Sequence, residues 1–175
     1  MQDARSELDY LFSVTYEELR RLASSVVRRD ASATISPTAL VNEVWLKLAN
    51  SPRLFVSSPL HFKRIAARAM RQVLVEAARH RHAGKRGGGG EAMLVTFDES
   101  VSQGPSSSRD VLSLDSALDD LARINPRQAM MVECRFFGGL DVSETAAALE
   151  VSEATILRDW RAVKAWLANE VRRSG

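Results

Sequence analysis

Positive charge concentrates between residues 60 and 90 of the sequence. This stretch holds eight lysines and arginines and one acid, Glu76, although the whole chain carries a net charge of only +2. The three histidines, His61, His80 and His82, lie in the same stretch. Charge gathered in one segment favours a polyanionic partner such as nucleic acid, and the alternative is the solvated surface of an ordinary helix.

The sequence offers no set of residues for catalysis, metal binding or a cofactor. His80 and His82 stand two apart, so on a helix they do not share a face. Residues 84–87 contain Gly-Lys but lack the Ser or Thr and the preceding strand of a phosphate loop. The single cysteine, Cys134, excludes an internal disulfide and is expected to be a small buried hydrophobe. We therefore expect a binding protein, not an enzyme, with no cofactor and no metal.

A second candidate site lies near the C-terminus. Asp141 and Glu144 have the spacing of a capping box, and Ser152 is placed to cap a following helix. Two helices joined by a turn of three or four residues form a helix-turn-helix, whereas the alternative is a plain α-hairpin. At about 100° per residue, one face of the second helix would turn toward a DNA major groove. The residues expected to read DNA are Ser152, Ala154, Thr155, Arg158 and Arg161.

Helical periodicity in both halves of the chain predicts the elements that position these groups. Apolar stripes mark helices over residues 8–26, over 40–48 after the cap Ser36-Pro37, and over 62–77 after Pro59. Further helices are expected over 112–121, from Pro126 to the glycines at 138–139, and in the helix-turn-helix. The predicted fold class is all-α.

Glycine and serine divide the chain. Six of the nine glycines fall between residues 83 and 110, a composition typical of a flexible linker. Within it, residues 93–97 could form a short extended segment. We expect an N-terminal helical domain at 1–82, a linker at 83–111 and a C-terminal helical domain at 112–175. The apolar runs are too short to span a membrane and the first residues lack an apolar signal core, so a cytoplasmic location is expected.

Several short motifs in order now resemble a known family. They are Tyr16–Ala23 (YEELRRLA), Pro37–Leu48 (PTALVNEVWLKL), Phe62–Arg71 (FKRIAARAMR) and the helix-turn-helix. In this order, from about Leu8 to Leu167, they resemble the extracytoplasmic-function (group IV) sigma factors of bacterial RNA polymerase. The resemblance implies an alternative sigma factor that directs promoter recognition, DNA melting and transcription initiation.

The resemblance assigns roles to each part. The N-terminal domain would be sigma region 2 and the C-terminal domain region 4, which would read the −35 element and rest on the β flap. The linker would pass near the RNA exit path. The third helix would bind the −10 element through Arg64, Arg68, Arg71, Gln72 and Arg79. The second helix would dock on the β′ clamp helices of core RNA polymerase through Leu40, Val41, Asn42, Glu43, Val44, Trp45 and Lys47.

Two rival functions remain at this point. A helix-turn-helix transcription regulator could act on promoter DNA without core polymerase, although no sustained heptad indicates a dimer helix. A nuclease would need a carboxylate or histidine cluster. The resemblance also leaves open an anti-sigma factor or another regulator as a partner. The chain also departs from many relatives by carrying Ala67-Arg68 where they carry Arg-Asn.

Overall fold

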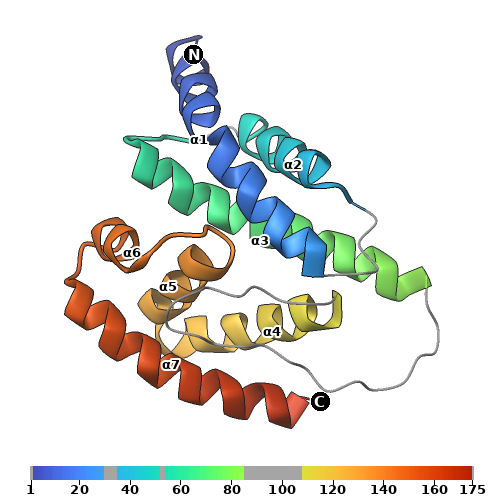
Figure 1. Ribbon diagram of the computed structural model, residues 1–175, viewed down its shortest axis with the longest axis vertical. Coiled ribbons are helices and arrows are strands. Elements are labelled where there is room, and N and C mark those ends of the chain that lie inside the picture. The colour runs from blue at the N-terminus through green and yellow to red at the C-terminus, as the bar shows by residue number, and fades with distance from the viewer. Residues whose placement is uncertain (1, 30–34, 52–53, 85–107, 175) are drawn as a thin grey trace.

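The computed structural model describes residues 2–29, 35–51, 54–84 and 108–174. These residues form seven helices and no strand, which confirms the predicted all-α class (Figure 1). The predicted extended segment at 93–97 and most of the predicted linker lie outside the described residues. The helices are α1 (Gln2–Arg29), α2 (Pro37–Ala49), α3 (Pro59–Gly84), α4 (Ser108–Ile124), α5 (Pro126–Phe136), α6 (Val142–Ala148) and α7 (Glu153–Ser174).

Local capping explains where the helices begin. The Ser36 hydroxyl accepts a hydrogen bond from the Ala39 amide at 3.1 Å, and Pro37 occupies the first helical turn of α2. Asn125 caps α5 in the same way, with its side-chain oxygen 3.2 Å from the Gln128 amide nitrogen. The predicted cap at Ser36-Pro37 and the predicted start of a helix at Pro126 are confirmed.

The central helix of the fold is α3. It contacts α1 and α2 on one side and α4, α5 and α6 on the other (Figure 1). The buried side chains of the two groups of helices form one continuous hydrophobic cluster. We call α1–α3 the N-terminal unit and α4–α7 the C-terminal unit. Whether they fold as two domains with the predicted boundaries stays a prediction, although α4 begins at Ser108, before the expected boundary.

The C-terminal unit has a core of large side chains. Phe136, Trp160 and Leu167 are each almost completely buried, and the rings of Phe136 and Trp160 lie 5.7 Å apart. The guanidinium of Arg135 stacks over the indole of Trp160 at 4.3 Å, a cation–π contact. Cys134 on α5 is also buried, as predicted, and desolvation raises the pKa of its thiol to about 12. Within the described residues, no helix is long and apolar enough to cross a membrane.

Candidate nucleic-acid interfaces

The helix-turn-helix has both of its predicted caps. The Asp141 carboxylate accepts from the Glu144 amide at 2.7 Å, and the Glu144 carboxylate accepts from the Asp141 amide at 3.1 Å, which completes a capping box on α6. The Ser152 hydroxyl accepts from the Thr155 amide at 3.2 Å at the start of α7. Between them Glu150 has φ +55°, the left-handed conformation that glycine more often supplies at a helix C-terminus.

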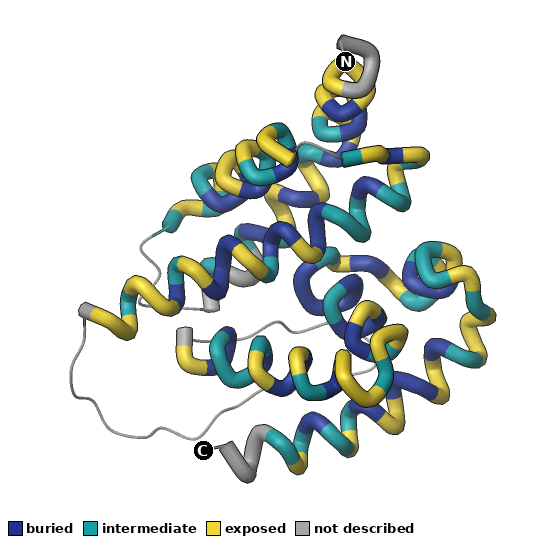
Figure 2. The backbone as a smooth tube through the Cα atoms, turned by 180° about the vertical axis from the view of Figure 1, so that it is seen from behind, coloured by how far each residue is buried: buried dark blue, intermediate teal, exposed yellow. Residues whose placement is uncertain are grey.

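The predicted DNA-reading face of α7 points to solvent. Ile156, Trp160 and Val163 are each 1% exposed and anchor the helix to the C-terminal unit. Burial therefore alternates along α7 with the period of a helix (Figure 2). Among the described residues, α7 contacts α4, α5 and α6 and makes no contact with α1–α3. Ser152, Ala154, Arg158 and Arg161 are exposed and Thr155 is half-buried on the outward side.

The predicted DNA face of α3 is divided. Arg68, Gln72 and Arg79 are exposed, whereas Arg64 and Arg71 are half-buried against the C-terminal unit. An Arg64 guanidinium nitrogen lies 3.4 Å from the Ala148 carbonyl oxygen at the end of α6. The five residues thus share one helix, but the fold packs Arg64 and Arg71 against the C-terminal unit and pairs the exposed Arg79 with Asp115 on α4.

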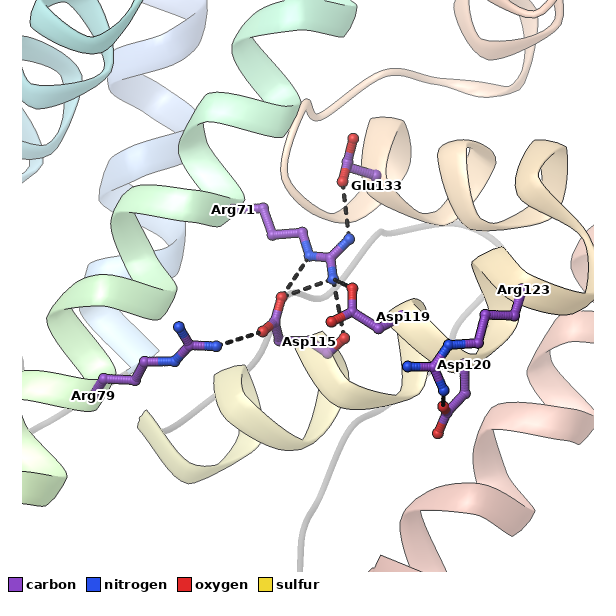
Figure 3. A network of polar contacts seen from close by, with 7 residues as sticks. All are labelled: Arg71, Arg79, Asp115, Asp119, Asp120, Arg123 and Glu133. Carbon is purple, nitrogen blue, oxygen red and sulfur yellow. Dashed lines mark hydrogen bonds and ion pairs between the residues drawn. The ribbon is translucent and has the colours of Figure 1, made fainter.

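Arg71 is the centre of a polar network between the units (Figure 3). It donates hydrogen bonds to the carboxylates of Asp115 at 2.8 Å, Asp119 at 2.7 Å and Glu133 at 3.1 Å, and to the Asp115 carbonyl at 3.0 Å. Arg79 approaches the second oxygen of Asp115 at 3.5 Å. Burial alone would lower the pKa of the Arg71 guanidinium, but its hydrogen bonds to the three acids raise the pKa above its usual value. Arg71 therefore stays charged and paired.

Lys63 makes a second polar link between the units. Its ammonium lies 2.8 Å from a carboxylate oxygen of Glu144 on α6 and also pairs with Glu18 on α1. Burial alone would lower the pKa of Lys63, and its hydrogen bonds to Glu144 and Glu18 raise the pKa instead. Glu144 therefore serves the capping box with one oxygen and α3 with the other.

The residues predicted to dock on polymerase do not all reach the surface of α2. Leu40, Val41 and Val44 are 0% exposed and belong to the core between α1 and α3. They hold the helix against the core, and their predicted contact with polymerase stays a prediction. Asn42 and Glu43 are exposed, Trp45 is half-buried with its ring 4.7 Å from that of Phe12, and Lys47 pairs with Glu76 at 2.7 Å.

Leu46 was not predicted as part of this surface. It is half exposed, beside Glu43 and Trp45 in the helix. The signal in the sequence was its spacing: Leu40, Val44 and Leu48 repeat every four residues as a buried stripe, and Leu46 falls outside that stripe. Sequence reasoning also missed the three acids around Arg71, because they lie far from it in the chain.

Comparison with known proteins yields one result. The model of the ECF sigma factor family matches residues 2–173, which is nearly the whole chain and includes all of the helices described above except the last residue of α7. No curated protein and no solved structure matches it. The helix-turn-helix, the basic third helix and the order of the earlier motifs agree with this match. The chain therefore belongs to the family of ECF sigma factors.

Proposed function

We propose that this chain binds core RNA polymerase and places it on promoter DNA through three surfaces. The outward face of α7 reads the −35 element, the exposed basic face of α3 binds the −10 element, and the outward residues of α2 dock on the β′ clamp helices. Family membership implies an alternative sigma factor that works with RNA polymerase. The assignment of each surface is the proposal.

The observation that carries the proposal is the outward face of α7. Arg158 and Arg161 project from a helix whose opposite side is held by almost completely buried Ile156, Trp160 and Val163. Arginine reads guanine edges through paired hydrogen bonds, which requires the helix that carries it to be firmly oriented. A capped helix on a packed core meets that requirement.

The basic face of α3 supports a different kind of contact. Arg68 and Arg79 stand three turns apart on one side of the helix, with Gln72 between them. Such a row suits the phosphate backbone, and each phosphate neutralised contributes about −0.9 to the slope of log affinity against log salt. Binding that is stronger for melted than for duplex promoter DNA shifts the polymerase toward the open complex.

The experiment that tests the proposal is association with purified core RNA polymerase, measured by size exclusion and then by titration. We expect the wild-type chain to coelute with the core enzyme. The double variant Glu43→Ala/Trp45→Ala should bind at least about tenfold more weakly, because it removes an exposed charge and an aromatic anchor from α2.

Glu7→Ala is the matched control, since Glu7 is an exposed acid on α1 outside the proposed surface. It should bind as the wild type does. Normal binding by the double variant would remove α2 from the proposal. A folded wild-type chain that never coelutes, yet binds promoter DNA, would favour the regulator that acts without polymerase.

A further inference from the structure

A large apolar side chain stands on the outward face of α7. Leu157 is 38% exposed, and among residues 153–170 of the helix it is the one large apolar side chain that is exposed. The helix does not need it for packing, because Ile156, Trp160 and Val163 already anchor the opposite side. Single exposed leucines are common on protein surfaces, so the neighbours of Leu157 decide what it can do.

The neighbours of Leu157 on this face are an alanine and two arginines. Ala154 lies three residues before Leu157 and Arg161 four residues after it, so the three share one strip of the helix surface. Arg158 borders the strip, four residues after Ala154, and all four side chains are exposed. The face therefore combines a small apolar patch, which consists of Ala154 and Leu157, with two cations.

The polar side chains at the start of α7 favour contact of the apolar patch with base edges over contact with phosphates. The Ser152 and Thr155 hydroxyls bind each other at 2.9 Å, and the Ser152 hydroxyl also accepts from the Thr155 amide at 3.2 Å. Glu153 is exposed one turn before Leu157, and its carboxylate would repel a phosphate placed there. The floor of a groove is therefore the part of a DNA duplex that suits Leu157.

The floor of the major groove contains one apolar group that a leucine can recognise. Thymine presents its C5-methyl group there, and apolar side chains contact this methyl, whereas arginine pairs with the edge of guanine. Taking one methyl group out of water strengthens binding about fourfold. The same contact also covers part of the exposed surface of Leu157.

We propose that Leu157, with Ala154 beside it, recognises the methyl group of a thymine in the −35 element. The inference rests on the proposed function, because it takes the outward face of α7 as the face that enters the groove. Arg158 and Arg161 then supply attraction to phosphates and contacts with guanine, and Leu157 supplies a preference for thymine at a neighbouring base pair. Leu157 is thus a specificity residue of this helix.

The test removes single methyl groups from the DNA. Duplexes are selected from a random library with the holoenzyme and, in parallel, with the full chain alone. Each thymine of the selected site is then replaced, one at a time, by deoxyuridine, which keeps the hydrogen-bonding groups of thymine and lacks its C5-methyl group. Fluorescence anisotropy of fluorescein-labelled duplexes measures the affinity for each replacement.

We expect deoxyuridine at one thymine to weaken binding by the wild type about fourfold, equally at low and high salt, because an apolar contact releases no counterions. In Leu157→Ala the same replacement should change the affinity by less than about 1.5-fold. Leu157→Met keeps an apolar side chain and should retain the effect of deoxyuridine. Ile124→Ala is the matched control, since Ile124 is an apolar residue 70% exposed at the end of α4, and it should behave as the wild type. Circular dichroism checks that each variant folds.

A wild type that binds every deoxyuridine duplex as tightly as the thymine duplex would overturn the proposal. So would an undiminished effect of deoxyuridine in Leu157→Ala, because the methyl group would then act through the shape of the DNA. A chain that selects no duplex, alone or in the holoenzyme, contradicts the proposed role of α7 as well. Failure to bind core polymerase is a separate outcome, since the parallel selection needs only the full chain.

Discussion

The two faces that we propose bind DNA are built differently. On α7 the apolar residues occupy one side and the residues proposed to read DNA the other, and the helix makes no contact with the N-terminal unit among the described residues. On α3, arginines alternate with small and β-branched residues that are themselves buried, including Ala67 and Val75. Among the described residues, the proposed DNA face of α7 makes no contact with the N-terminal unit, whereas the proposed DNA face of α3 packs in part against the C-terminal unit.

The difference teaches how to interpret a basic helix. A stripe of arginines next to a single apolar stripe indicates an exposed charged surface. When alanines and valines also occur between the arginines, the helix has enough apolar surface to pack on two sides. The charge of such a helix then no longer indicates exposure, because acids from a distant segment can form ion pairs with its arginines.

The largest effect that separates the two faces is expected from Arg71→Ala. This change removes the arginine that pairs with Glu133 and leaves Asp115 only the longer 3.5 Å contact with Arg79, although each of the two acids has a side chain only 14% exposed. Losing one partner of a mostly buried ion pair is strongly destabilising, and we expect a loss of about 3 kcal/mol in the free energy of unfolding. Urea unfolding followed by circular dichroism measures it.

Arg68→Ala is the matched control for Arg71→Ala. Arg68 is an exposed arginine on the same helix, and its loss should change the free energy of unfolding by no more than about 0.5 kcal/mol. Equal effects of the two variants would mean that the network around Arg71 does not hold the units together, and the comparison between the faces would fail.

A smaller effect, on binding and not on folding, is expected from Arg158→Ala on α7. Because Arg158 has a side chain 73% exposed, its removal should leave stability unchanged. Binding of the holoenzyme to promoter fragments selected from a random library should weaken by about 1–3 kcal/mol. Arg158→Lys keeps the charge but loses the planar guanidinium, so it should recover phosphate attraction without restoring sequence preference. Unchanged binding by Arg158→Ala would show that another face of the helix-turn-helix reads DNA.

The features that could be predicted from the sequence are those that depend on residues close together in the chain. The caps at Ser36, Asp141 and Ser152 follow from side chains within three residues of the amide they bind. The inward side of α7 follows from the helical repeat. These features needed no knowledge of how the helices meet.

What could not be predicted depends on segments that meet only after folding. The acids Asp115 and Glu133 are 44 and 62 residues from Arg71, and nothing local pairs them with it. In α2, the family motif includes both core and surface positions. Leu40, Val41 and Val44 are buried in the core, and their contact with polymerase stays a prediction.

The smallest effect concerns the capping box, which links the two faces. Asp141→Ala removes the acceptor for the Glu144 amide and should lower the free energy of unfolding by about 1 kcal/mol, whereas Asp141→Asn keeps a capping oxygen and should lose much less. Amide hydrogen exchange measured for each helix shows which helices lose stability in the Asp141→Ala variant. Glu144 also binds Lys63 on α3. With the two units packed together, the Asp141→Ala variant should therefore exchange faster than the wild type both in α6 and in α3 near Lys63. Faster exchange confined to α6 and α7 would mean that the helix-turn-helix opens independently of α3, and the cap would then serve the DNA-reading face alone.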